Sequence, residues 1–351
     1  MSVVNAREFE LAFSLNKQSA LITGVTASQV NKALPQRGFA PSMQEFPAQV
    51  SDRNWYGKGH SFPTFRDIIY KRLVVPAREF SMSQLSALYA PAFVLGNLST
   101  SQPNSASAPT VYDHTLTFQD PGTNPNCLFT SMIEKAGAEY QNLISGLVIN
   151  SFTVRGERND HVVLGWEGFA RTMTSDATTL PALAASQSFF KLLKCDVRFG
   201  SSGGSYATNV SGEVLSLNLN VTQNAKGFWL PGAASGSEEL LSKVLIGDQA
   251  VSGSLTMFLD ATRRSLFTGD TECELKITMW GSEIGATGYR HMVTITLPRV
   301  KGSAEGFSEV DGTTAYTFTF DENSVLKGSS DEFIQWTVRS NIDASELLVA
   351  A

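Results

Sequence analysis

One short stretch of this sequence has the residue types and spacing of a catalytic nucleophile. Gly200-Ser-Ser-Gly-Gly204 matches the pattern GxSxG, in which the middle serine, here Ser202, attacks an acyl group. That chemistry requires a helix directly after the serine, so that the hydroxyl lies at a helix N-terminus. The residues that follow, SYATNVSGEV, have no helical period. We therefore interpret residues 200–205 as a loop rich in glycine and serine.

The remaining reactive side chains form no recognisable centre. None of the four histidines lies in an HExxH, HxH or Cys/His pattern, which argues against zinc: His60, His114, His161 and His291. The cysteines are widely spaced and indicate reduced thiols of a cytosolic product: Cys127, Cys195 and Cys273. Nothing isolates an acid–base pair around Asp113 and Asp120, and no glycine-rich stretch ends in the GK[ST] of a phosphate-binding loop. We expect no catalytic residue, no cofactor and no metal site.

Composition limits the partners of the chain. The 351 residues carry a net charge of −6, and only 17% of them are charged. A surface that grips nucleic acid needs clustered Lys and Arg, so we expect no specific DNA binding, although loose contact with DNA is compatible with this charge. No window approaches the ~18 consecutive apolar residues of a membrane span. The first residues lack the apolar run of a signal peptide, so we expect synthesis in a cytoplasm.

The elements that would position any site are mainly strands. Alternating apolar and polar residues predict strands over 72–75, 114–118, 147–154, 161–170, 191–199, 213–222, 251–259, 272–280, 291–297, 315–320 and 333–338. The clearest case is EVLSLNLNVT (213–222), where leucines and a valine alternate with Ser, Asn and Thr. Alternation of this kind is typical of an antiparallel sheet with one face on a core. Short helices are expected over 84–90, capped by Ser81 or Ser83 and ending before Pro91, and over 128–143, 238–245 and 261–267.

The order of the segments leaves a tandem duplication open. REFSMSQLSALYA (78–90) resembles LTMFLDATRRSLFTG (255–269), and three further weak matches share an offset close to half the chain length. The interpretation divides the chain into residues 1–172, a sparsely charged linker over 173–187, and residues 188–351. The alternative is that short strand–helix–strand units simply look alike. Four aromatic residues fall in expected loops, where they indicate contacts with another subunit or simple packing: Trp55, Tyr56, Phe228 and Trp229.

Residues 245–300 resemble the core of the tail tube proteins of long-tailed bacteriophages. The resemblance rests on SGSLT in an alternating strand, a short helix, a second alternating strand, and YRHMVTITLPRV. AREFELAFSLNKQS near the start and SGLVINSFTV followed by VVLGWEGFA resemble other parts of the same family. The resemblance implies an antiparallel β-sandwich or barrel of the tail tube type with a few short helices. It also implies a structural virion protein without catalytic residues.

The resemblance further implies how such a protein acts. Rings of this chain would stack into a tube in the phage tail and deliver the genome to the host cell. A ring would contain three copies if the chain is duplicated, which we favour, or six if it is not. Expected partners are further copies of the chain, the tape-measure protein, the tail terminator and the baseplate proteins, with DNA passing through unbound.

The polar sides of the strands are candidates for the wall of such a tube. A channel for a polyanion should be polar and weakly acidic, because basic residues would hold phosphates. The candidate lumen-facing residues are Ser216, Asn218, Asn220, Thr222, Ser252, Ser254, Thr256, Glu272 and Glu274. Alternative interpretations are another tail or head component (a tail terminator, a baseplate hub or a decoration protein), a β-sandwich surface-binding module using the loop aromatics, and an enzyme using Ser202.

Overall fold

The structure is a computed structural model. It describes residues 9–21, 30, 32–34, 44–51, 66–136, 140–175, 179–182, 187–201, 206, 208–229, 240–258, 272–310, 312–328 and 332–348. The predicted loop serine Ser202, the predicted helix over 261–267, and Trp55, Tyr56 and His60 lie outside these residues. None of the helices in these ranges is both long and apolar enough to cross a membrane.

The described residues are mainly β. In the first half the elements are β1 Phe9–Phe13, β2 Lys32–Leu34, β3 Gln44–Ser51, β4 Arg66–Ser81, α1 Ser86–Leu95, β5 Gly96–Ser101, β6 Tyr112–Phe118, β7 Thr130–Ala136, β8 Tyr140–Glu157, β9 Val163–Ala170 and β10 Thr172–Ser175. They continue with η3 Leu192–Lys194, β11 Cys195–Ser201, β12 Thr208–Asn209, β13 Val214–Thr222, β14 Lys226–Phe228, β15 Lys243–Leu245, β16 Ala250–Phe258, β17 Cys273–Glu283, β18 Arg290–Val300, β19 Ser303–Val310, β20 Thr313–Phe320, β21 Val325–Leu326, β22 Gln335–Ser340 and η4 Ala344–Glu346. Each of the eleven predicted strands coincides with one of these strands over most of its length.

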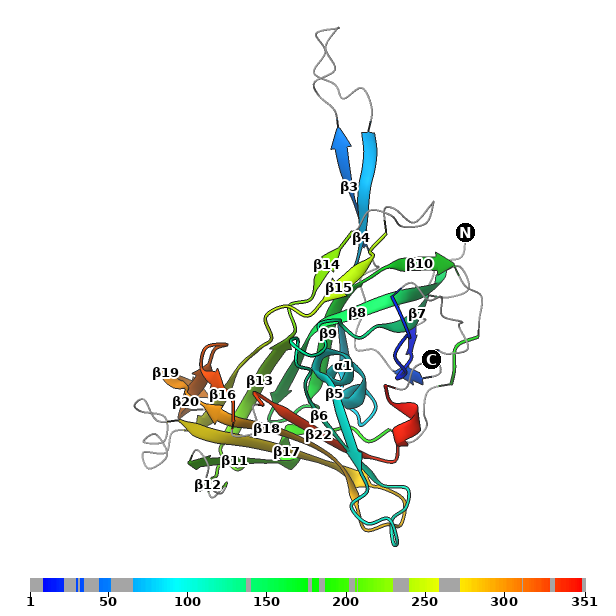
Figure 1. The fold of residues 1–351 in the computed structure, drawn as a ribbon. Coiled ribbons are helices and arrows are strands. Elements are labelled where there is room, and N and C mark those ends of the chain that lie inside the picture. The colour runs from blue at the N-terminus through cyan, green and yellow to red at the C-terminus, as the bar shows by residue number, and fades with distance from the viewer. Residues whose placement is uncertain are drawn as a thin grey trace.

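Two large antiparallel sheets build the body of the molecule (Figure 1). The 12-stranded sheet has the order β19-β20-β16-β13-β8 and divides at β8. The C-terminal half of β8 pairs with β9, which pairs with β4; its N-terminal half pairs with β7, followed by β1 and β2. The division falls at Gly146, whose φ of +63° is a left-handed conformation that favours glycine. The 8-stranded sheet has the order β12-β11-β17-β18-β22-β6-β5.

The core lies between these sheets. Leucine and valine side chains of β13 and β16 share one buried cluster with those of β17, β18 and β22. Phe199 of β11 meets Phe318 of β20 edge-to-face with ring centroids 5.6 Å apart, which joins the two sheets. The arrangement confirms the predicted antiparallel, sandwich-like class. Both sheets combine strands from residues 1–172 with strands from 188–351, and the tandem duplication stays a prediction.

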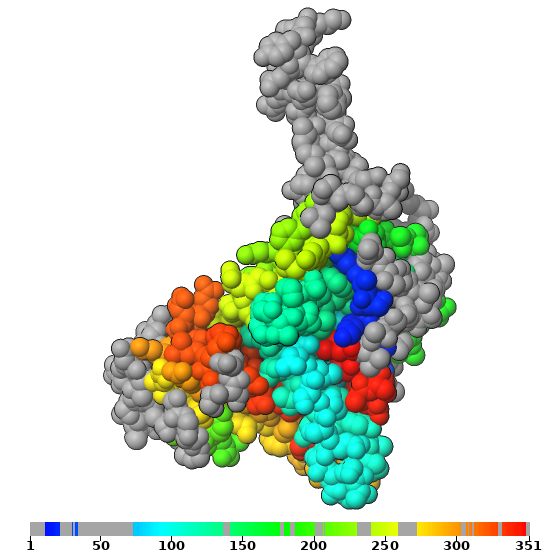
Figure 2. Space-filling model, viewed as in Figure 1, coloured from blue at the N-terminus to red at the C-terminus, as the bar shows by residue number. Residues whose placement is uncertain are grey.

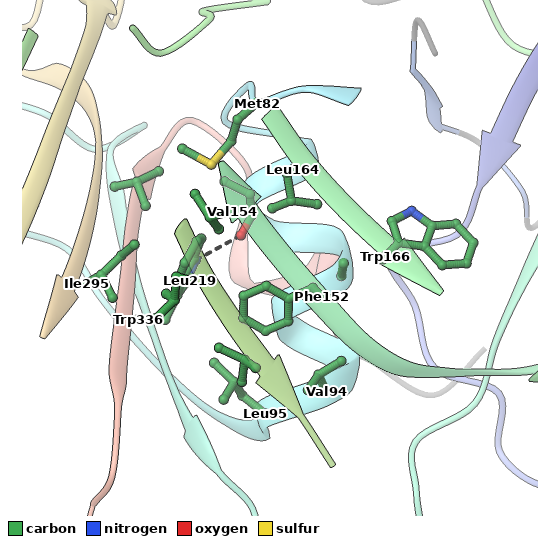
Figure 3. Packing of buried hydrophobic residues seen from close by; sticks show 14 of the residues in the cluster. Met82, Val94, Leu95, Phe152, Val154, Leu164, Trp166, Leu219, Ile295 and Trp336 are labelled. Carbon is green, nitrogen blue, oxygen red and sulfur yellow. Dashed lines mark hydrogen bonds between the residues drawn. The ribbon is translucent and has the colours of Figure 1, made fainter. Parts of the chain in front are cut away.

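The helix α1 begins at Ser86, two residues after the predicted start, and ends later than predicted. The Ser83 hydroxyl accepts from the amide of Ser86 at 3.3 Å, and the Ser86 hydroxyl accepts from the amide of Ser83 at 2.8 Å, as in a capping box. The prediction that the helix stops before Pro91 is wrong, because α1 continues to Leu95 with all ten of its residues buried. Proline leaves one carbonyl of the preceding turn without its usual amide donor. That carbonyl, on Ala87, accepts instead from the indole of Trp336 at 2.9 Å (Figure 3).

Two predicted helices are strands. Residues 130–136 form β7 and residue 140 begins β8, although the apolar spacing of 128–143 is compatible with a helix. Residues 130–134 are all buried, because β7 lies between β1 and β8 within the sheet and is covered on both faces. A strand buried on both faces loses its alternation and cannot be told from a helix by period. Residues 243–245 of the predicted helix 238–245 form β15, while 238–239 lie outside the described residues.

Candidate functional site: a polar face on the large sheet

The strand β13 has one apolar and one polar side. Leu217, Leu219 and Val221 are buried in the core, with at most 2% of each residue exposed. Between them Asn218 is exposed and Asn220 is half-buried. Successive side chains of a strand point to opposite faces, so the polar residues share the face turned away from the core.

The register of the neighbouring strand extends this face. Ser216 of β13 lies opposite Thr256 of β16, Asn218 opposite Ser254, Asn220 opposite Ser252, and Thr222 opposite Ala250. Seven of the nine candidate lumen residues are thereby brought together on one side of one sheet. They are Ser216, Asn218, Asn220, Thr222, Ser252, Ser254 and Thr256, and with their neighbours on β4, β8, β9 and β20 they form what we call the polar face.

Strands on both sides continue the polar face with residues that the sequence analysis did not select. On β8, Thr153 lies opposite Asn220, Arg155 opposite Asn218, and Glu157 opposite Ser216. On β20, Thr317 and Thr319 lie opposite Thr256 and Ser254, and the Thr256 and Thr317 hydroxyls are 3.1 Å apart. The same alternation in SFTVRGE and TAYTFTF is the signal that would have found them.

The charges on the polar face are few and mostly acidic. Arg155 forms an ion pair with Glu79 of β4, and both side chains are more than 40% exposed. The exposed Glu167 of β9 accepts a hydrogen bond from Ser151 at 3.2 Å, and Glu157 is also exposed. These side chains amount to three carboxylates and one guanidinium among many hydroxyls and amides. Arg158, which follows β8, adds a second guanidinium 5.5 Å from the centroid of the Phe258 ring at the end of β16. The described residues of the face therefore offer a polyanion two arginines, one of them paired, and more carboxylates than cations.

The other two candidate lumen residues lie elsewhere. Glu272 directly precedes β17, and both its carboxylate oxygens accept from Arg299 at 2.9 Å. Glu274 is on β17 in the 8-stranded sheet, where it lies opposite Gly200 and is only 9% exposed. The structure does not bring them to the polar face, because alternation alone does not say which sheet a strand joins.

The loop aromatics divide into one exposed and one packed residue. Phe228, at the end of β14, is 40% exposed. Trp229 is partly buried against a small cluster that includes Phe169, Leu241 and Val244. Trp229 thus anchors the β14–β15 hairpin to the body, while Phe228 is available for contact.

The titratable residues that the sequence analysis considered are held within the framework. Asp113 accepts from Arg339 through both oxygens, at 2.6 and 2.7 Å. His114 is fully buried; its Nε2 donates to the carbonyl of Ile342 at 2.9 Å, and burial lowers its pKa. Burial also raises the pKa of the Cys127 thiol to about 12, so no thiolate is available near neutral pH. Within the described ranges, no three His, Cys, Asp or Glu side chains gather as metal ligands would.

Comparison with known families decides where this architecture belongs. The model of the phage tail tube protein family matches residues 8–321, which is most of the chain and includes every strand of the polar face. The chain belongs to the phage tail tube protein family. No curated protein sequence matches it significantly.

Membership in the phage tail tube protein family indicates what role this fold has. This tail tube protein is a structural component of the phage tail, and the family assignment confirms the resemblance seen in residues 245–300. Tail tube proteins assemble with copies of themselves, so the surfaces of interest are those that another copy would meet.

Proposed function

We propose that this protein forms stacked rings whose polar faces line the channel of the tail tube, through which the genome reaches the host cell. The single observation that supports this most strongly is the polar face itself. Antiparallel strands in continuous register present hydroxyls and amides on one side and a core on the other. A sheet with this two-sided character suits a wall between protein and an aqueous channel.

The chemistry of the polar face fits the passage of DNA. Phosphates bind to Lys and Arg by displacing counterions, and each such contact adds affinity. Of the two arginines described on this side of the sheet, Arg155 already pairs with Glu79 and Arg158 lies over the ring of Phe258. Three carboxylates around Arg155 repel phosphate, so DNA can move along the wall without being held. Asn218 lies between Arg155 and Ser254 in the middle of this surface.

Lateral closure of the ring would use the edges of the large sheet. In the described part of the chain, β19 pairs only with β20 and ends one side of the sheet. Phe307 on this edge strand is 59% exposed. An exposed edge with a large apolar side chain favours pairing with another chain. We infer that β19 meets the β4 side of the next copy, in a ring of three copies if residues 1–172 and 188–351 are duplicated units, and otherwise of six.

The remaining partners follow from the role in the tail. The tape-measure protein would occupy the channel during assembly, while the tail terminator and the baseplate would meet the two ends of the tube. The protein would be made in the cytoplasm of the bacterial host and act without catalysis.

Thiol labelling of assembled tubes tests the orientation of the polar face. Asn218→Cys places a thiol on the face, and Ser99→Cys, exposed on β5 of the other sheet, is the matched control. Before assembly, both thiols should react with a maleimide coupled to a protein too large to enter the channel. In tubes seen by electron microscopy, only the control should still react with it, while Asn218→Cys still reacts with a small maleimide. Equal reaction of both variants in tubes would contradict the orientation, and failure to form tubes under any condition would contradict the function.

A further inference from the structure

A pocket of about 450 Å³ lies beside the β14–β15 hairpin. Its walls are the segment after β1, residues 124–129 and β15. Backbone hydrogen bonds hold the walls together: the amide of Gln18 donates to Phe129 at 2.8 Å, and that of Cys127 donates to Val244 at 3.2 Å. This volume lies within the range of pockets that bind small molecules or peptide segments.

The lining of the pocket combines apolar walls with positive charge. Leu21, Phe129 and Val244 contribute apolar surface, and Lys17 and Lys243 contribute the only charges among the described lining residues. Neither lysine forms an ion pair within the described ranges. Such a pocket favours a ligand that is partly apolar and carries carboxylates.

A segment with this chemistry occurs on the same chain, at the turn between β19 and β20. The turn reads Glu309-Val310-Asp311-Gly312-Thr313, with two carboxylates around an aliphatic side chain. Glu309 is exposed, Val310 is half-buried, and Gly312 has a φ of +74° that suits a tight turn. Lysine and arginine are absent from this stretch, so its charge is opposite to that of the pocket.

The pocket and the turn lie at opposite ends of the same strands. Thr222 lies opposite Ala250 at the end of β13 and β16 that leads to the β14–β15 hairpin. Phe258, at the other end of β16, lies opposite Ala315 of β20, close to the turn where Val310 lies opposite Thr313. Figure 1 shows the β14–β15 hairpin (yellow-green) next to the projecting β3–β4 hairpin. Figures 1 and 2 show β20 (orange) on a separate part of the surface from the yellow-green β14–β15 hairpin.

We propose that the pocket binds the β19–β20 turn of a second copy in the adjacent ring. Two complementary surfaces at opposite ends of one chain make a head-to-tail contact, which repeats without closing and so extends a filament. Lys17 and Lys243 meet the acidic turn that contains Glu309, and Val310 enters the apolar part of the pocket. The assignment rests on the proposed tube, for which it names one contact between rings.

Charge reversal on the full chain tests the contact. Lys17→Glu combined with Lys243→Glu should raise the protein concentration needed for tube growth by about tenfold or more, since close charge pairs at interfaces carry this much affinity. Glu309→Lys combined with Asp311→Lys should have the same effect. The chain that carries all four substitutions has its charges exchanged and should polymerise again. Light scattering and electron microscopy measure growth.

Two controls make the outcome specific. Lys226→Glu changes an exposed lysine of β14 outside the pocket, and Glu322→Lys changes an exposed glutamate after β20; both variants should grow like wild type. The turn does not occupy the pocket if either double variant grows normally. The same conclusion follows if the fourfold variant stays defective although each double variant folds with wild-type circular dichroism. In the second case another segment or a small anion is its ligand. Whatever the variants do, tube formation by the wild-type protein in the same assay supports the proposed function. If the wild-type protein forms no tubes, the proposed function is refuted.

Discussion

The helix α1 depends on Trp336, which lies 249 positions away in the sequence from Ala87, because its indole serves the Ala87 carbonyl. Pro91 removes the amide that would serve this carbonyl within the helix, and the indole of Trp336 replaces it at 2.9 Å. Trp336 is fully buried, and its ring meets Phe152 edge-to-face at 5.4 Å (Figure 3). Trp336→Phe keeps an aromatic ring but removes the only N–H that the side chain offers.

The expected loss of stability has two parts. Leaving a buried carbonyl without a donor costs about 1–3 kcal/mol. The smaller ring adds roughly 1–2 kcal/mol for lost contacts and unfilled space. We therefore expect Trp336→Phe to lower the free energy of unfolding by about 2–5 kcal/mol in urea denaturation followed by fluorescence. Trp166→Phe is the matched control, because Trp166 is only 2% exposed but its indole N–H makes no hydrogen bond to described residues, so only the packing part should be lost.

A second substitution isolates the hydrogen bond. In a Pro91→Ala background the helix supplies its own amide to Ala87, so Trp336→Phe should cost about 1–2 kcal/mol less than in the wild type. The difference between the two costs measures the coupling of Pro91 to Trp336. A coupling of zero, or a cost of Trp166→Phe equal to that of Trp336→Phe, would refute the reasoning that the indole replaces the missing amide.

Two further predictions concern charge. Glu134→Gln, which removes the carboxylate that pairs with the fully buried Arg78, should cost about 3–5 kcal/mol in urea denaturation, whereas Glu79→Gln on the exposed pair with Arg155 should cost at most about 1 kcal/mol. Similar costs for the two variants would contradict the role given to burial. Burial lowers the pKa of His114, so the unfolded chain binds a proton at this histidine more readily than the folded chain does. The free energy of unfolding should therefore fall as the pH drops below about 6.5. Urea midpoints at several pH values should show this slope, and His114→Gln should reduce it, while the remainder comes from His291, whose pKa burial also lowers.

The predictable part of this protein is its half-exposed strands. EVLSLNLNVT identifies β13, and VSGSLTMF identifies β16, because one face of each packs on the core and the other does not. Alternation also selected seven residues that the structure places side by side on the polar face, although their orientation toward a channel stays a prediction. It could not place Glu272 and Glu274, since the pairing of β17 with β11 and β18 depends on contacts far away in sequence.

The sequence-based predictions that were wrong also have physical causes, and these too lie in contacts between residues far apart in the sequence. Residues 130–134 are covered on both faces, so the sequence carries no period that distinguishes a strand from a helix. Pro91 normally ends a helix, and the donor that compensates for it, Trp336, cannot be inferred from the residues around it. The pocket also escapes sequence analysis, because Lys17 and Lys243 come to the same pocket only through the contacts that the segment after β1 and β15 each make with residues 124–129.

The two proposed kinds of contact between copies place different demands on the chain. Lateral closure by strand pairing uses backbone groups, which every residue carries, so an edge such as β19 needs few particular side chains beyond Phe307. Stacking along the tube joins surfaces without a shared sheet, so its specificity has to come from complementary side chains. The two lysines of the pocket and the acidic turn, at opposite ends of the same strands, meet that demand. Added salt should therefore weaken stacking more than ring closure, because screening acts on charge pairs and leaves backbone hydrogen bonds nearly unchanged. Sedimentation of assembled tubes at increasing salt should release rings before single chains, and direct release of single chains would contradict this division of roles.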